Sequence, residues 1–381
     1  MIAAAERLST TSTYYFASKL QEVAQLAAEG KPIINMGIGS PDLPPPPEAV
    51  QALTQALTAP KAHQYQSYRG LPELRQAMAG FYQRHYGVTL DPEQQLLPLM
   101  GSKEGIMHIS MAYLNPGDEV LLPNPGYPTY AAVTKLVQAH PRFYALSAKN
   151  DWLPDLEALA AEDLSKVKLM WINYPHMPTG YQASAQAFED VVAFAKANDL
   201  LLINDNPYSF ILNDHPLSLL STPGAAEHCL ELNSLSKSFN LAGWRMGLVA
   251  GAPEMIANIL KVKSNMDSGM FYGIQKGAAA VLNTEGNWFK NLNATYRKRR
   301  ALIWKLADRL GCTYSREGAG LFVWAKLPPG REANAFIDEL LYTHSIFITP
   351  GTVFGSQGTG YIRFSLCVSE TDIQEAIKRF E

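Results

Sequence analysis

The sequence predicts an α/β protein in which helices cover both faces of a mostly parallel sheet, with a second, smaller α+β domain. Short apolar runs at 167–175 and 200–205 enclose a helical pattern at 187–199. Buried strands on either side of a helix are typical of βαβ units and parallel sheets. The pattern of predicted elements changes near residue 284, where a long helical pattern is followed by short strand-like runs separated by glycine and proline. This change indicates a separate α+β unit.

The strand and helix patterns of the first part follow one another in order. An apolar run at 118–123 ends in turn residues and predicts another buried strand, ahead of the two at 167–175 and 200–205. The segment 187–199 places Phe188, Val191, Val192 and Ala195 on one face of a helix, because residues three and four apart share a face. That apolar face is expected to pack on the sheet.

The second part begins with one long helix, expected from about Thr284 to Leu310. Three strand-like runs follow, and the N-terminal segment is expected to pack with them. The predicted division is a large cofactor-binding domain over 47–283 and a small domain, with an N-terminal arm, formed by 1–46 and 284–381.

Composition excludes several classes of protein. The 381 residues are 47% hydrophobic and 18% charged, with a net charge of −3, so neither a nucleic-acid nor a membrane-surface partner is expected. Cys229, Cys312 and Cys367 are scattered, which argues against a disulfide framework or a thiolate metal site. No apolar run is long enough for a membrane span. These features predict a cytoplasmic protein without a metal site.

Three groups of polar residues follow predicted strands. Asp205 ends the strand 200–205, the turn 174–180 follows the strand before it, and Lys237 closely follows the run after it. Ligands of parallel α/β sheets bind beyond the carboxyl ends of the strands. The three groups are therefore expected to meet at one edge of the sheet.

Several motifs occur in a fixed order: "GIGSPD", "GSKEG", "NPGYPTY", "NDNPY", "NSLSK" and "YIRFSL". With them the chain resembles the class I/II aminotransferases over nearly its whole length. The resemblance implies the aspartate-aminotransferase fold (fold type I), pyridoxal 5'-phosphate as cofactor and a homodimer. It also implies ping-pong transfer of an amino group from an amino acid to a 2-oxo acid.

The resemblance assigns the chemistry to three residues. Lys237 matches the lysine that condenses with the cofactor aldehyde and later moves a proton. Asp205 matches the carboxylate that keeps the ring nitrogen protonated, and Tyr208 matches the donor to the ring's phenolic oxygen. For Asp205 the plainer interpretation is a turn cap after a strand.

The resemblance also implies a phosphate site. Ser102 and Lys103 begin a helix whose backbone N–H groups suit a phosphate, although the same pattern fits any capped helix. Ser234, Ser236 and Arg245 match the other phosphate contacts, and the guanidinium offers a planar fork of donors.

Four further positions follow from the family. Tyr65 matches a tyrosine that reaches the phosphate from the partner subunit, and Tyr127 matches the aromatic ring that stacks on the cofactor. Arg363 matches the arginine that binds the substrate's α-carboxylate. Gly39 matches the glycine whose backbone approaches that carboxylate.

One position departs from the family. The usual turn is Asn-Pro-Thr-Gly, but here Met177 stands in place of the asparagine that donates to the ring oxygen. A thioether cannot donate a hydrogen bond. His176 is either a compensating donor or a turn histidine that faces solvent.

Two alternatives to an aminotransferase remain for function. A carbon–sulfur β-lyase would use the same cofactor, and a regulator could keep the fold without the chemistry. The complete set of Lys237, Asp205 and Arg363 argues against the regulator. The presumed side-chain pocket, including residues 11–20 and 264–273, has no evident second arginine and favours neutral or aromatic amino acids. The "GIG" and "YYFASKL" stretches also resemble the LL-diaminopimelate aminotransferase subgroup.

Overall fold

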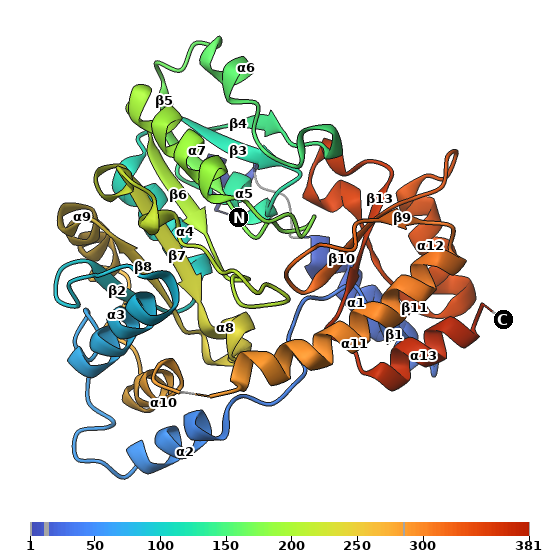
Figure 1. The fold of residues 1–381 in the computed structure, drawn as a ribbon, viewed down its shortest axis with the longest axis horizontal. Helices are drawn as coiled ribbons and strands as arrows, with labels where there is room; N and C mark the ends of the chain where they lie inside the picture. The colour runs from blue at the N-terminus through green and yellow to red at the C-terminus, as the bar shows by residue number, and fades with distance from the viewer. Residues whose placement is uncertain (1, 11–14, 285, 381) are drawn as a thin grey trace.

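The computed structural model describes residues 2–10, 15–284 and 286–380. A seven-stranded sheet with helices on both sides forms the larger part (Figure 1). Its strand order is β2-β8-β7-β6-β5-β3-β4, and all neighbours are parallel except the pairs that β8 makes with β7 and β2. The strands are β2 (Leu96–Leu99), β3 (Glu119–Asn124), β4 (His140–Ala145), β5 (Val167–Ile172), β6 (Leu201–Asp205), β7 (Cys229–Ser234) and β8 (Gly247–Gly251). The predicted mostly parallel sheet is confirmed.

The central strands are largely apolar because helices cover both faces of the sheet. In β5, Leu169 and Trp171 join one buried cluster, whereas Met170 and Ile172 join another, as the alternation of side chains in a strand requires. One face packs on α4 (Ser102–Tyr113), α5 (Pro128–Leu136) and α9 (Pro253–Lys263). The other packs on α3 (Pro72–Tyr86), α7 (Ala185–Ala197) and α10 (Tyr272–Leu282). The remaining helices of this part are α2 (Pro47–Ala56), α6 (Leu156–Ala160) and α8 (Leu235–Ser238).

Helix α7 has the predicted buried face. Phe188, Val191, Val192 and Ala195 are all buried against the sheet. Ser184 caps the helix by accepting a hydrogen bond from the backbone N–H of Ala187, which is the usual role of serine before a first helical turn.

The smaller part contains a four-stranded antiparallel sheet of order β12-β13-β10-β9. The strand β1 (Ile34–Asn35) pairs in parallel with β11 (Ile346–Phe347), so the N-terminal segment lies beside the C-terminal elements (Figure 1). The other elements are β9 (Thr313–Tyr314), β10 (Phe322–Lys326), β12 (Thr349–Pro350), β13 (Tyr361–Ser365), α1 (Tyr15–Ala28), α11 (Trp288–Arg309), α12 (Ala333–His344) and α13 (Glu370–Lys378).

Two element boundaries differ from the prediction. The long helix begins at Trp288 rather than Thr284, and Glu285 lies outside the described residues. The strand expected over 167–175 ends at Ile172, because the side chain of Asn173 accepts a hydrogen bond from Met177 and starts a turn. Within the described ranges, no helix has the length and apolar character needed to cross a membrane.

Candidate active site

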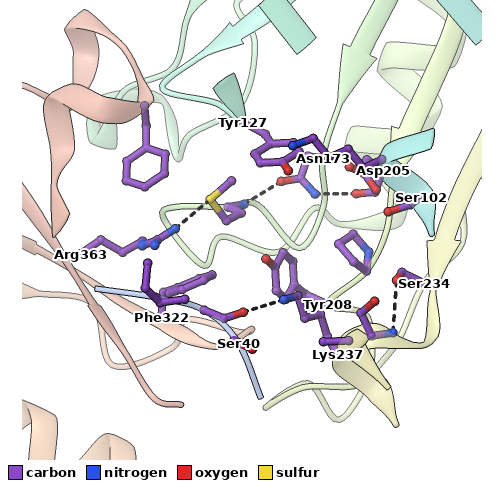
Figure 2. A pocket seen from close by; sticks show the side chains of 18 of the residues that line it. Ser40, Ser102, Tyr127, Asn173, Asp205, Tyr208, Ser234, Lys237, Phe322 and Arg363 are labelled. Carbon is purple, nitrogen blue, oxygen red and sulfur yellow. Dashed lines mark hydrogen bonds between the residues drawn. The ribbon is translucent and has the colours of Figure 1, made fainter. Parts of the chain in front are cut away.

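A cavity of about 420 Å³ lies at the carboxyl ends of the central strands, between the two parts of the chain (Figure 2). The sequence-predicted residues that line it are Gly39, Ser102, Lys103, Tyr127, Asp205, Tyr208, Ser234, Ser236, Lys237, Arg245 and Arg363. The other lining residues are Leu20, Ile38, Ser40, Tyr130, Asn173, Met177, Pro207, Ala242, Phe322 and Phe354. Asp205, Lys237 and Met177 of the turn 174–180 all line the cavity, so the three segments meet at one edge of the sheet as expected.

Lys237 stands on α8, one short turn beyond the end of β7. Its Nζ donates a hydrogen bond to the backbone oxygen of Gly39 at 2.6 Å. Burial lowers the pKa of Lys237, and the positive charges of Arg363 and Arg245 lower it further. Both effects favour the neutral amine, which is the nucleophilic form.

Asp205 is the last residue of β6 and is buried. One carboxylate oxygen, Oδ2, accepts a hydrogen bond from the Tyr130 hydroxyl at 2.8 Å. The other, Oδ1, has no hydrogen-bond partner among the described residues. Burial raises the pKa of Asp205 to about 6, and the bond from Tyr130 opposes that rise. A buried oxygen of this kind is costly unless a ligand supplies a donor.

Asn173 fixes the backbone around Asp205. Its amide nitrogen donates to the backbone oxygen of Asp205, and its amide oxygen accepts from the backbone N–H of Met177 at 2.9 Å. One side chain therefore ties the end of β6 to the turn that carries Met177.

The first turn of α4 forms a cradle with Arg245. Gly101 precedes the helix with φ +85°, a backbone conformation that favours glycine. A Cβ atom there would collide with the guanidinium of Arg245. Ser102 and Lys103 follow at the helix start, where free N–H groups and the helix dipole favour an anion. Arginine and N–H groups on one side of a cavity suit a phosphate.

Arg363 lies on β13 with its guanidinium between two aromatic rings (Figure 2). The guanidinium carbon is 3.8 Å from the ring centre of Phe322 and 4.6 Å from that of Phe354. Its Nη2 donates to the backbone oxygen of Gly37 at 2.7 Å, and its Nη1 donates to the sulfur of Met177 at 3.4 Å. These contacts hold the charged group at the cavity wall.

Gly39 lies directly against one of these rings. A Cβ atom at Gly39 would collide with the ring of Phe322. Phe322 also meets Tyr208 edge to face, with ring centres 5.9 Å apart. Burial raises the pKa of Tyr208, so its hydroxyl is a hydrogen-bond donor at neutral pH.

Tyr65 is the one predicted site residue that does not line the cavity of its own chain. Its side chain is 89% exposed. The expectation that it reaches a second copy stays a prediction.

Both interpretations of His176 are wrong. Its ring is buried and does not line the cavity; the two nitrogens contact Thr179 Oγ1 at 2.8 Å and the backbone oxygen of Pro125 at 3.1 Å. Burial lowers the pKa of His176 to about 3, so the ring is neutral. Its role is to hold the turn.

Sequence reasoning missed Tyr130, Asn173, Phe322 and Phe354. Asn173 lay inside the strand predicted over 167–175; the sheet-edge argument that found Asp205 applies to it only once the strand is known to end at Ile172. The other three are aromatic residues whose positions beside Asp205 and Arg363 depend on tertiary packing, which no local sequence pattern shows.

The residues present fit pyridoxal phosphate. The partnerless Oδ1 of Asp205 would accept from the ring nitrogen, and the cradle of Gly101, Ser102 and Arg245 would hold the phosphate. Lys237 supplies the amine. The cavity therefore brings together the acceptor, the anion site and the amine that this cofactor needs.

Comparisons with known proteins agree with this fit. Residues 31–380 match the family described as aminotransferase class I and II. The LL-diaminopimelate aminotransferase of Desulforudis audaxviator is 40% identical over 377 residues, which cover 98% of this chain and 96% of that protein. The enzyme of that name from Dehalococcoides mccartyi is 39% identical over 376 residues, covering 98% and 97%.

Solved structures show the same fold. BacF of Bacillus subtilis, without ligand, superposes with a TM-score of 0.96 at 36% identity, covering 100% of this chain and 98% of that one. The N-succinyldiaminopimelate aminotransferase of Mycobacterium tuberculosis gives a TM-score of 0.91 at 29% identity, covering 99% of this chain and 99% of that one. The chain belongs to the class I and II aminotransferase family and is, like its relatives, a pyridoxal-phosphate enzyme that transfers amino groups.

Proposed function

We propose that this enzyme takes the amino group from an amino acid with an uncharged, largely apolar side chain and passes it to a 2-oxo acid. The single observation that carries the proposal is the character of the cavity wall near Arg363. Phe322, Phe354 and Met177 contact Arg363 there, and Leu20 and Ile38 are further apolar residues that line the cavity. An apolar wall of this kind favours an apolar side chain and penalises a buried charge without a partner.

The roles of the charged residues follow from this assignment. Among the described lining residues, Lys103, Lys237 and Arg245 are assigned to the cofactor, which leaves Arg363 as the cation for the substrate. Arg363 binds the α-carboxylate, a group that all amino acids share. It is therefore not available to bind a second carboxylate in the substrate's side chain. Tyr208 donates a hydrogen bond at the cofactor's phenolic oxygen.

The proton transfer is assigned to Lys237. Bound pyridoxal phosphate supplies an aldehyde that condenses with amines and a ring that withdraws electrons. Lys237, with its lowered pKa, takes the proton from the substrate's Cα onto its amine, and the same amine gives up a proton later in the transfer of the amino group. Asp205 holds the proton on the ring nitrogen.

A second candidate substrate is LL-diaminopimelate, because relatives with that printed name are up to 40% identical over 98% of the chain. Its far end carries a second ammonium and a second carboxylate. The described lining residues left over after cofactor and α-carboxylate offer no charged partner for them. We therefore place it second.

The experiment is a panel of donors tested with the purified holoenzyme against 2-oxoglutarate and pyruvate, with the new amino acid measured by chromatography. We expect kcat/KM for leucine, methionine or phenylalanine to exceed that for aspartate and LL-diaminopimelate by about tenfold or more, the cost of burying an unpaired charge. A preference for LL-diaminopimelate overturns the proposal. Pyruvate and ammonia formed from cystathionine would instead identify a β-lyase.

We also propose that the enzyme works as a cytoplasmic homodimer in which Tyr65 reaches the phosphate of a second copy. The exposure of Tyr65 supports this arrangement, since a tyrosine prominently exposed on one chain is available to another. The three cysteines are free thiols, which suits a reducing compartment. Sedimentation analysis of the holoenzyme tests the dimer, and a fully active monomer would exclude it.

A further inference from the structure

We propose that Arg75 is a positioning residue that acts on the pocket of a second copy of this chain. It does so by fixing the segment that presents Tyr65. This role rests on the proposed homodimer and adds to it a residue that lies outside the cavity. Two segments, 63–71 and 264–271, together form what we call the platform.

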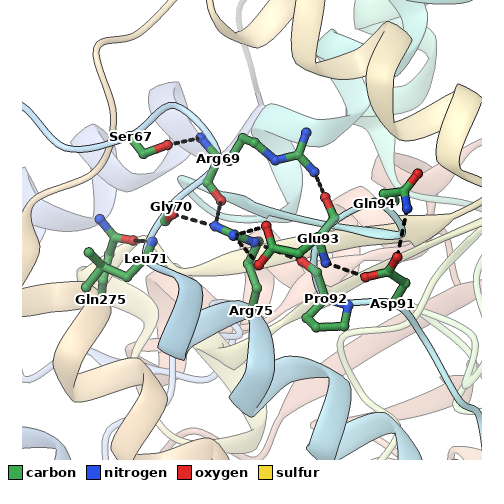
Figure 3. Close-up of polar contacts among 10 residues, drawn as sticks. All are labelled: Ser67, Arg69, Gly70, Leu71, Arg75, Asp91, Pro92, Glu93, Gln94 and Gln275. Atoms are coloured by element: carbon green, nitrogen blue, oxygen red, sulfur yellow. Dashed lines mark hydrogen bonds and ion pairs between the residues drawn. The ribbon is translucent and has the colours of Figure 1, made fainter.

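Arg75 ties two stretches of chain together from a buried position on α3 (Figure 3). The residue is 4% exposed. Its Nε donates to the backbone oxygen of Pro92 at 2.8 Å, and its Nη1 donates to that of Gly70 at 2.7 Å. Its Nη2 contacts both carboxylate oxygens of Glu93, at 2.7 and 2.6 Å. A planar guanidinium is the side chain that can serve three acceptors at once in this geometry.

The end of the first platform segment is held at further points. Arg69 donates from its guanidinium to the backbone oxygen of Glu93 (Figure 3). Gly70 has φ +75° and packs against Pro98 and Gln275, so the turn requires glycine. Tyr65 stands only five residues before this turn, so its direction depends on how the turn is held.

A buried amide joins the two platform segments. Gln275 accepts from the backbone N–H of Leu71 at 2.7 Å and donates to the backbone oxygen of Met270 at 2.7 Å. Gln275 is fully buried. A Cβ atom at Gly269 would collide with the backbone oxygen of Gln66, so the segments are also in close contact there.

An ion pair stabilises the second platform segment, 264–271. Lys263, which is buried, lies 2.7 Å from the carboxylate of Asp267, and that carboxylate also accepts from the backbone N–H of Gly269 at 2.8 Å. Glu104 and His108 lie near the same carboxylate, but the ammonium of Lys263 already serves as its cation. Hydrogen bonds and an ion pair between polar groups therefore hold the platform in place.

The outer side of the platform has the opposite character. Its exposed apolar side chains are Tyr65, Tyr68, Met266 and Phe271. Holding a loop in one conformation costs conformational entropy, and aromatic side chains that stay exposed to solvent do not offset that cost. A loop that is ordered by polar contacts and yet exposes its aromatic side chains is therefore unfavourable in an isolated chain. The arrangement suits a surface that must meet a second copy in one fixed shape.

The test uses heterodimers made from two differently tagged chains and purified through both tags. In the trans heterodimer, one chain carries Arg75→Met and the other carries Lys237→Ala. In the cis heterodimer, one chain carries both substitutions and the other is unchanged. Each heterodimer has a single pocket with Lys237. In the trans form that pocket faces a platform with Arg75 intact, and in the cis form it faces a platform without Arg75.

We expect the trans heterodimer to keep about half of the wild-type activity, because one of its two symmetric sites is complete. The cis heterodimer should bind pyridoxal phosphate about tenfold more weakly or worse, the effect of losing a hydrogen bond to a charged group. The reverse pattern, with the cis form normal and the trans form impaired, would show that Arg75 serves only its own subunit and would overturn the inference.

Controls separate this inference from the proposed dimer. The same pair of heterodimers made with Tyr65→Ala must show the trans form active and the cis form impaired; if it does not, the shared site itself fails. If that pair behaves as expected and the Arg75 pair does not, only the role of Arg75 fails.

Arg84→Met, an exposed change on the same helix, should leave both forms alike. Arg75→Lys, which keeps the charge opposite Glu93, replaces Arg75→Met if the latter does not fold.

Discussion

The sulfur of Met177 lies 3.4 Å from Nη1 of Arg363, the arginine proposed to bind the substrate carboxylate. Met177 occupies the position at which the family usually has an asparagine that serves the cofactor's ring oxygen. In this enzyme the side chain at that position meets the substrate-binding residue instead. A thioether is a weak acceptor, so the substrate's carboxylate can displace it at little cost.

Met177→Asn should lower the pKa that governs the visible absorption band of the bound cofactor. An added donor stabilises the anionic ring oxygen by on the order of 1.5–3 kcal/mol, which corresponds to about one to two pKa units. The measurement is a spectrophotometric pH titration of both holoenzymes. An unchanged pKa, or one that rises, would mean that another donor already serves the oxygen.

Phe322→Leu should weaken binding of the amino acid. The guanidinium of Arg363 lies 3.8 Å from the ring centre of Phe322, and losing that cation–π contact costs about 0.5–2 kcal/mol. KM for the amino donor should therefore rise by about two- to thirtyfold, with a much smaller change in kcat. Phe143→Leu, at an exposed phenylalanine on β4, is the matched control. A fall in kcat at constant KM would contradict this role.

Asp205→Asn should change how the stability of the cofactor-free protein depends on pH. The folded pKa of Asp205, about 6, lies above its ordinary value of 3.8, so folding favours the protonated carboxyl. As pH rises from about 4 to 6, the free energy of unfolding of wild type should fall by up to about 3 kcal/mol relative to that of the variant. Above pH 6 the difference between the two should stay constant. Urea unfolding across this pH range measures it. A difference that moves the other way would show that the carboxylate is stabilised in its charged form.

The sequence predicted the part of the site that depends on local pattern. Asp205 and Lys237 follow buried apolar strands, and parallel topology brings strand ends to one edge. Arg363 has no such local signal, and only the resemblance to a family placed it in the site. Phe322 was missed because its contact with Arg363 joins two separate strands, and Phe354 was missed because its contact depends on how the chain turns between it and Arg363.

His176 shows where local reasoning misled. A histidine in a turn is expected at the surface, because most turns face water. Here the segment around Ala319 covers the turn, since its backbone N–H donates to the oxygen of Gly180 at 2.8 Å. That cover comes from a part of the chain more than a hundred residues away, so the neighbours of His176 in sequence carry no sign of it.

Lys237, as the amine that holds the cofactor, is the residue on which the proposed chemistry depends most. The measurement is borohydride reduction of the holoenzyme followed by peptide mass mapping, for wild type and for Lys237→Ala. Lys103→Ala, which alters another lysine of the same cavity, is the control. We predict that the peptide containing Lys237 carries the reduced cofactor in wild type and in the control, and that Lys237→Ala carries none on any lysine of the cavity. Cofactor fixed to Lys103, or a labelled Lys237→Ala protein, would contradict the role of Lys237.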